Sequence, residues 1–199
     1  MKLLKKLKPM KNKEFFKLLI NPFTRIAGWQ AFGLGLVVLC ISGIIGTYGN
    51  VIFDGVIDMH FAKGITMPYS FSCMAINTLT LVVVMWITGV IISKSFRFID
   101  ILGTMTLSKA PFLLLAIAGF FTKAPDMNEI MKNPMAILSS TSFLVLTLMT
   151  IPILIWSITL MYNALKISCG VKGNKLTVAF IIAILISEAI SKILILKFT

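Results

Sequence analysis

The sequence predicts an all-α membrane protein, a bundle of five transmembrane helices with a cytoplasmic N-terminus and an external C-terminus. The chain has 199 residues, of which 58% are hydrophobic and only 13% are charged, and its mean hydropathy is +0.97. Soluble domains are about half apolar and about a quarter charged. Five apolar runs, each long enough to cross a hydrocarbon core, alternate with short polar segments. Little of the chain is left for a globular domain.

We expect two parts, a basic cytoplasmic or interfacial segment over residues 1–30 and a transmembrane domain over residues 31–199. Within that domain the apolar runs place the five spans at about residues 31–49, 71–93, 104–121, 136–165 and 176–196. The fourth run is longer than the hydrocarbon core requires, so we expect that helix to tilt or to bend at Pro152.

The charges of the connecting segments predict the orientation. Residues 1–30 hold eight Lys or Arg against one Glu, and the connections after the second and fourth spans are also net positive. The two remaining connections are neutral or slightly acidic. Because Lys and Arg favour the cytoplasmic side of short loops, five spans with the N-terminus inside satisfy every connection.

Residues 1–20 alternate Lys with Leu and Phe, without the continuous apolar core and cleavage site of a signal peptide. Two interpretations stay open, an amphipathic segment on the membrane surface, broken by Pro9, and a frayed basic tail. In either case anionic membrane lipid is the expected partner. The net charge of +12 is concentrated beside the membrane, so nucleic acid is not expected.

The first span places small residues on one face, where they let another helix approach closely: Gly35, Ser42, Gly46 and Gly49. Packing inside the monomer is the favoured interpretation, and a homo-oligomer seam is the alternative. Before this span, Asn21-Pro22 is typical of a helix start, with Asn as the cap and Pro in the first turn. We expect that helix to reach Gln30.

The external connection over residues 50–70 contains Asp54, Asp58 and His60, which are residue types that bind metal ions. A solvated loop is the favoured interpretation, because one His and two carboxylates in a flexible segment are common without a metal. The three cysteines form no CxxC pair, so no zinc site or disulfide framework is indicated. We predict no metal site and no cofactor.

The third span contains Lys109 and Pro111 well inside its apolar run. Either the helix kinks at Pro111, or Pro111 opens a new helix and residues 99–109 lie along the membrane surface. In both cases we expect Lys109 to extend toward the cytoplasmic headgroups.

Glu188 in the fifth span is the ionisable residue with no evident role there, and Lys192 lies one helical turn further on the same face. One interpretation is a local Glu188–Lys192 pair near the outer surface. The other is a polar intramembrane site lined by both residues with Ser187 and Ser191, with Lys109 as a third charged member that enters from the cytoplasmic side.

The helical hairpin of the last two spans carries several features in a fixed order: Trp156 with Leu160 four residues later, Ala164-Leu165-Lys166, Gly170, and a Lys-rich step that ends at Lys175. Two further patches are Phe98-Ile99-Asp100-Ile101-Leu102-Gly103, followed by Ala110-Pro111 and a Leu run, and Asn21-Pro22 before the first span.

In the order and spacing of these patches, most of residues 20–195 resembles the Yip family, the five-span Ypt-interacting-protein domain that is also widespread in bacteria. The resemblance implies a five-helix membrane fold and brings no catalytic residues. Eukaryotic members resemble adaptors for Rab-type GTPases and carry an acidic-aromatic-Gly-Pro motif before the first span. This chain lacks that motif, so the GTPase role is not carried over. Its short N-terminus suits a bacterial member.

No catalytic motif is present: the phosphate-loop pattern is not met around Gly170, the only His lies in an external loop, and the spans contain no pair of carboxylates. Our first hypothesis is a non-enzymatic scaffold or adaptor of the bacterial cytoplasmic (inner) membrane, which binds other membrane proteins or lipids. The alternative is a small transporter or channel whose polar site includes Glu188, Lys192 and Lys109.

Overall fold

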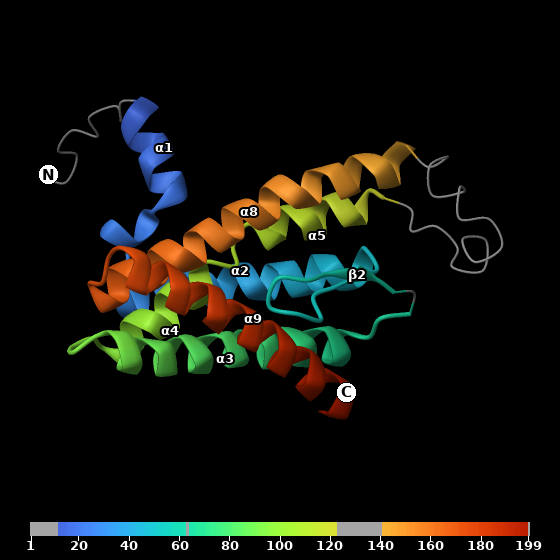
Figure 1. The fold of residues 1–199 in the computed structure, drawn as a ribbon. Coiled ribbons are helices and arrows are strands. Elements are labelled where there is room, and N and C mark those ends of the chain that lie inside the picture. Colours follow the sequence, from blue (N-terminus) through green and yellow to red (C-terminus); the bar gives the residue numbers. More distant parts are fainter. Residues whose placement is uncertain (1–11, 63, 123–140, 199) are drawn as a thin grey trace, which may run out of the picture.

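The all-α prediction is confirmed by a computed structural model, which describes residues 12–62, 64–122 and 141–198. In this part of the chain, five helical segments are long and apolar enough to cross a membrane, and one two-stranded sheet of four residues accompanies them (Figure 1). The spans are α2 (Gly28–Tyr48), α3 (Met67–Ile92), α4 with α5 (Phe98–Leu107 and Phe112–Phe120), α8 (Thr141–Cys169) and α9 (Asn174–Phe198).

The bundle has two distinct ends. One end holds the turn between α8 and α9 and the side from which the N-terminal residues enter, and we name it the hairpin end (left in Figure 1). The other holds β1 (Val51–Ile52) and β2 (His60–Phe61), and we name it the loop end. Gly170 and Gly173 both adopt positive φ in the α8–α9 turn, +65° and +82°, a conformation that glycine tolerates without strain. These two glycines allow the chain to reverse direction within the four residues that connect α8 and α9.

Helix α1 (Asn12–Ile20) precedes the bundle and is tied to α8. Glu14 in its first turn and Lys17 in its last complement the helix dipole. Trp156 Nε1 donates to the carbonyl of Leu19 at 2.8 Å, and Asn163 Nδ2 donates to that of Ile20 at 3.0 Å. Residues 12–20 are therefore an ordered helix and not a frayed tail, and its place on a membrane surface stays a prediction. Pro9 and the rest of residues 1–11 lie outside the described residues.

The helix expected from Pro22 to Gln30 is wrong. Pro22–Thr24 forms a single 3-10 turn, and Asn21 makes no side-chain capping bond to it. The next helix, α2, begins only at Gly28, which adopts φ +56°. Asp100 lies beside this glycine, since a Cβ added to Gly28 would lie 3.3 Å from its Oδ1. The chain therefore turns sharply before it enters the bundle.

The small residues of α2 pack inside the monomer, as the favoured interpretation required. A Cβ added to Gly35 would lie 2.7 Å from the backbone nitrogen of Leu107 in α4, and one added to Gly49 would lie 2.8 Å from that of Phe120 in α5. A Cβ added to Gly103 of α4 would likewise lie 3.0 Å from the backbone nitrogen of Phe32 in α2. These glycines let α2 contact the α4–α5 segment at backbone distance.

The third span is interrupted but stays in the bundle. Ser108 to Pro111 form a turn between α4 and α5, with the amide of Ala110 donating to the carbonyl of Leu107 and that of Phe112 to Lys109. Ile101 and Met105 of α4 are fully buried. The alternative in which residues 99–109 lie on the membrane surface is therefore wrong, and the break places Lys109 deep inside the protein.

Candidate functional site

The connection between α2 and α3 folds back onto the loop end of the bundle. β1 and β2 pair antiparallel, Val51 with Phe61 and Ile52 with His60. Val51, Ile52, Phe53 and Val56 are almost completely buried. The interpretation of residues 50–70 as a solvated loop is therefore wrong for its first half, because these apolar side chains draw it into the core.

Glu188 of α9 anchors this loop. Its Oε2 accepts a hydrogen bond from the backbone amide of Ile57 at 3.0 Å. The backbone of Gly55 lies against the same carboxylate so closely that a Cβ added there would overlap it. The glycine thus lets a buried backbone donor reach a carboxylate, which is a strong, charge-assisted contact.

Lys192 bridges two carboxylates on different elements. Its Nζ lies 2.5 Å from Asp58 Oδ2 in the loop and 3.6 Å from Glu188 Oε1 one helical turn back. The predicted Glu188–Lys192 pair is confirmed, but the shorter contact is to Asp58. With 42% of its side chain exposed, Lys192 lies near the surface. We name Asp58, Glu188 and Lys192, with Gly55 and Ile57, the loop lock.

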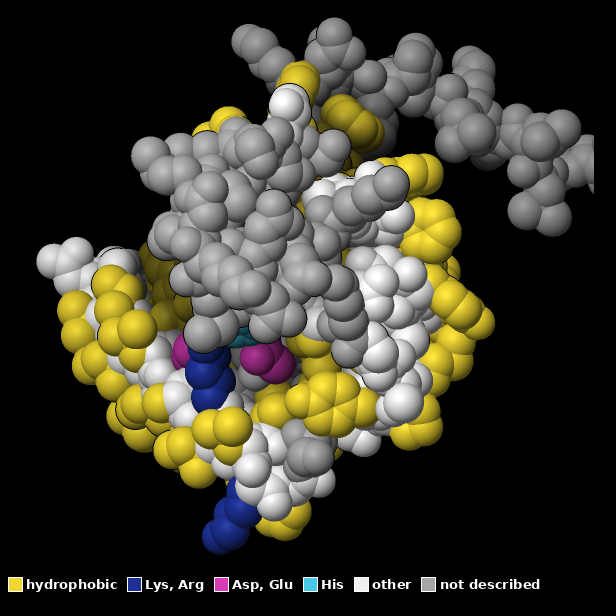
Figure 2. Space-filling model, turned by 90° about the vertical axis from the view of Figure 1, so that its right-hand side faces the viewer, with side chains coloured by type: hydrophobic (Ala, Val, Ile, Leu, Met, Phe, Trp, Pro, Cys, Tyr) yellow, Lys and Arg dark blue, Asp and Glu magenta, His cyan; other side chains and the backbone are white. Residues whose placement is uncertain are grey.

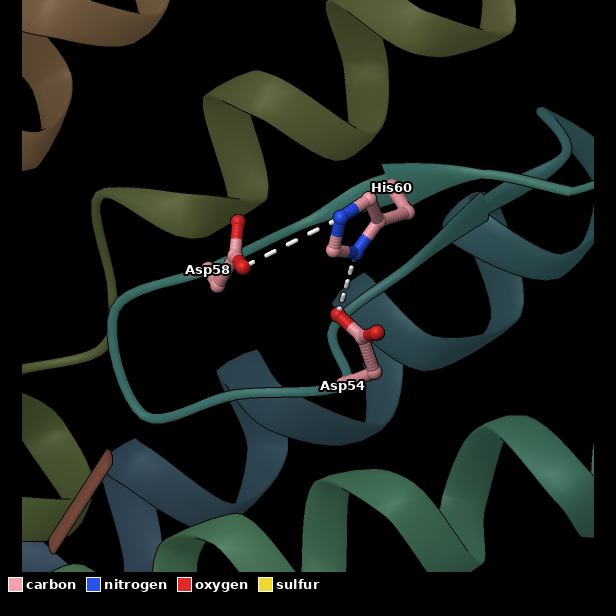
Figure 3. Close-up of side chains that lie close together, drawn as sticks. All are labelled: Asp54, Asp58 and His60. Atoms are coloured by element: carbon pink, nitrogen blue, oxygen red, sulfur yellow. Dashed lines mark hydrogen bonds and ion pairs between the residues drawn. The ribbon is translucent and has the colours of Figure 1, made fainter. Parts of the chain in front are cut away.

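His60 extends the loop lock toward solvent. Its Nδ1 is 2.8 Å from Asp54 Oδ1 and its Nε2 is 3.9 Å from Asp58 Oδ2 (Figure 3). Partial burial by itself raises the pKa of Asp58. The hydrogen bond from Lys192 and the charges of His60 and Lys192 outweigh burial, so this pKa lies below its ordinary value. In a view onto the loop end, carboxylates, an imidazole and a lysine gather at the centre among hydrophobic side chains (Figure 2).

The three groups Asp54, Asp58 and His60 do come together, with one ligand atom from each lying within 4.8 Å of the others. This is a donor set that divalent metals accept. In the described structure, however, Asp58 is already paired with the ammonium group of Lys192, and the imidazole of His60 is bonded to Asp54. Contacts within the protein account for the cluster, so we assign no metal to it.

Lys109 does not extend to the headgroups, and that expectation is wrong. It is 2% exposed, and its Nζ donates to Asn77 Oδ1 of α3. Asn77 Nδ2 in turn donates to the carbonyl of Phe53 at 2.7 Å. The buried amine therefore reaches the same loop as Glu188, but at a different point and through an amide.

The direct contacts of the predicted polar site are divided between two groups, although the charges of Lys109 and Glu188 still attract each other. Glu188 and Lys192 contact residues 54–58, whereas Lys109 acts through Asn77 on Phe53. Ser187 and Ser191 are buried, yet their hydroxyls donate to carbonyls of their own helix, those of Ala183 and Glu188. Both hydroxyls are therefore satisfied within α9.

Three contributors were missed by sequence reasoning: Asn77, Asp58 as the partner of Lys192, and Gly55. Asn77 is the only amide in a span whose other polar residues are Ser and Thr, and that could have identified it as the partner of a buried charge. No local signal connects Asp58 or Gly55 with α9, because the contacts join residues more than 130 positions apart.

Comparison with protein-family models, with curated proteins and with solved structures found no match for this chain. The class of protein, an integral membrane protein with five candidate spans, therefore rests on the fold itself.

Proposed function

We propose that the chain is a Yip-like, non-enzymatic scaffold or adaptor of a bacterial inner membrane, which binds other membrane proteins or lipids. The observation that carries the proposal is the use of its intramembrane charges. Glu188 and Lys192 hold the connection between α2 and α3, and Lys109 bonds Asn77. Charges at membrane depth usually mark a substrate or ion path. Here they are engaged in contacts within the chain, so we assign them to holding the fold together.

The partners of such a protein are expected on its lipid-facing sides. Large apolar side chains are strongly exposed on the outer faces of several spans, among them Ile91 of α3 at 73% and Leu196 of α9 at 86%. Helices in a membrane associate by close packing without help from the hydrophobic effect. These faces are where we place contacts with other membrane proteins, including a second copy of the chain.

Photo-crosslinking in native membranes tests the proposal. A benzophenone amino acid at Ile91 or Leu196 should give discrete protein adducts, whereas one at the fully buried Met85 should give none. An adduct of twice the monomer mass identifies a homo-oligomer. The scaffold hypothesis is abandoned if the exposed positions give no more protein adducts than Met85.

A second candidate, a transporter or channel, is favoured by one observation. Among the described residues no carboxylate lies within ion-pair distance of Lys109. A cavity of about 10 Å³ adjoins this amine between Asn77, Phe53 and Phe112. That space is the size of one water molecule. A buried cation beside a cavity that could hold one water molecule is a feature that ion pathways share.

Proteoliposomes separate the two candidates. Loaded with a pH-sensitive dye, wild-type vesicles should show no proton flux above protein-free vesicles if the scaffold hypothesis holds. Lys109→Met should then be less stable than wild type by about 1–3 kcal/mol, because Asn77 Oδ1 loses the hydrogen bond from the Lys109 amine. A wild-type flux that Lys109→Met abolishes would establish the transporter instead.

A further inference from the structure

An apolar groove of about 240 Å³ opens between α2 and α3, with α4 as its floor. It is lined by residues of α2 between Phe32 and Cys40, by residues of α3 between Phe71 and Val82, and by Leu102 and Thr106 of α4. The hydroxyl of Thr106 donates to the carbonyl of Leu102 at 2.7 Å. The groove therefore offers a ligand almost exclusively hydrocarbon surface.

The groove exists because α2 packs against α4 and meets α3 closely toward the loop end. Gly35 and Gly103 bring α2 and α4 to backbone contact. Toward the loop end, Gly43 of α2 faces Met74 and Phe71, and a Cβ added to it would lie 3.0 Å from Met74 Sδ. The groove is thus closed at that end. Its open side faces the lipid, with Leu36 and Leu79 at its rim exposed by 47% and 59%.

Its depth matches one leaflet. Phe32 lies four residues inside α2 and Cys40 twelve, so the groove spans about 6 to 18 Å from the start of the helix at a rise of 1.5 Å per residue. Half of a hydrocarbon core measures about 15 Å. On α3 the lining runs from Val82 back to Phe71, about 17 Å, and Val82 lies about 15 Å from the end of that helix at Ile92. A chain that starts at the level where α2 begins therefore reaches the bottom of the groove, and α3 extends beyond the entrance.

The charges near the groove differ in sign between the two ends. The connection between α3 and α4 at the hairpin end carries Lys94, which is exposed and makes no ion pair among the described residues. Arg97, which follows it, is paired with Asp100 at 2.9 Å, so Lys94 supplies the net positive charge of this connection. Trp86 packs edge to face on Phe98 beside this connection, at a ring separation of 5.8 Å. Trp at this level is typical of the headgroup region. At the loop end, by contrast, Asp54, Asp58 and Glu188 predominate.

We propose that this groove binds one acyl chain of an anionic phospholipid whose headgroup lies at the hairpin end, beside Lys94. The site deepens the proposed scaffold function and rests on it, because it names a lipid that the scaffold holds. The occupant follows from the apolar lining, the closed loop end, the depth of the groove along α2 and the exposed Lys94 beyond its entrance.

The test uses the full chain in nanodiscs that contain phosphatidylglycerol with a diazirine on one acyl chain. A diazirine near the ester should label the region of Phe32 and Leu102, and one near the terminal methyl should label the region of Cys40. Ala75, which is exposed inside the groove, provides a blocking variant. Ala75→Trp should reduce groove labelling by about tenfold. Ala189→Trp, the same substitution at an exposed position of α9 outside the groove, should leave it unchanged.

The assignment is overturned if labelling spreads evenly over lipid-facing positions such as Leu185 of α9, or if Ala75→Trp labels like wild type. A reversed order of the two diazirine positions overturns entry from the hairpin end. Equal labelling by phosphatidylcholine with the same chain overturns the anionic headgroup. If Ala75→Trp does not fold, Leu79→Trp at the rim takes its place.

These outcomes are independent of the tests of the scaffold function. A proton flux in proteoliposomes refutes the scaffold function, and with it the role given to the lipid, while groove labelling would still show that the lipid binds. Absence of groove labelling in a protein that gives protein crosslinks and no flux refutes the groove alone.

Discussion

The bridge made by Lys192 leads to a prediction that separates tertiary from local contacts. Asp58 lies 134 positions from Lys192 in the sequence, yet its carboxylate is 2.5 Å from Nζ, whereas Glu188, one turn away on the same helix, is 3.6 Å away. Double-mutant cycles should therefore give a larger coupling energy for Asp58 with Lys192 than for Glu188 with Lys192.

The expected magnitudes follow from geometry and exposure. Hydrogen bonds to charged groups contribute about 1.5–3 kcal/mol when shielded, but Lys192 and Asp58 are 42% and 35% exposed. Exposed ion pairs measure about 0.2–1 kcal/mol, so we expect about 1 kcal/mol for this pair. A pair at i and i+4 is worth about 0.3–0.5 kcal/mol, and the longer distance places Glu188 with Lys192 at or below that value.

The assay is the free energy of unfolding of the detergent-solubilised protein at neutral pH. The variants are Asp58→Asn, Glu188→Gln, Lys192→Met and the two double substitutions that contain Lys192→Met. Lys197→Met, at an exposed position in the last turn of α9, is the matched control and should be additive with Asp58→Asn. The reasoning is refuted if the Glu188 coupling is the larger one, or if neither coupling exceeds that of the control.

Three further predictions concern the contact between α2 and α4, the connection between α2 and α3, and the location of the C-terminus. Gly103→Ala should destabilise the fold by about 1–3 kcal/mol because its methyl group would meet the α2 backbone. Gly33→Ala should be neutral or stabilising by up to about 1 kcal/mol, because Gly33 has open space around it. Equal free energies of unfolding for the two variants would contradict the close backbone contact between α2 and α4. Because the pKa of Asp58 is lowered from 3.8 in the fold, its contribution persists above pH 3.8 and is lost as the pH falls through the folded value. Thermal unfolding should therefore show a steeper acid loss in wild type than in Asp58→Asn, and parallel profiles would count against the loop lock. Finally, Thr199→Cys should react with a membrane-impermeant thiol reagent in intact cells, and protection of that cysteine would contradict an external C-terminus.

The number and approximate position of the spans could be predicted because they depend on composition along the chain. A hydrocarbon core requires a run of about 20 apolar residues and a backbone that satisfies its own hydrogen bonds, and both conditions are local. The boundaries shifted by a few residues, and the third span, for example, starts at Phe98 and not at 104. There the apolar pattern does not reveal that Asp100 pairs with Arg97 and is accommodated at the end of the helix.

Only part of the candidate site could be predicted from the sequence in the same way. Glu188 and Lys192 could be paired from their spacing, since residues four apart share a helix face. The position of the Lys109 side chain could not be predicted, because its sequence neighbours are compatible both with extension to the headgroups and with burial beside an amide. What decided it was the turn at Ser108–Pro111, which directs Lys109 inward toward Asn77.

The sequence by itself therefore determined a membrane-spanning helical bundle and a set of ionisable residues inside it. Only the tertiary structure decided what those residues bind, because their partners lie on a loop that folds back onto the bundle. Burial of Val51, Ile52, Phe53 and Val56 brings that loop to α9. Once it is there, a charge at membrane depth is stabilised by the nearest donor or carboxylate, wherever that group stands in the chain.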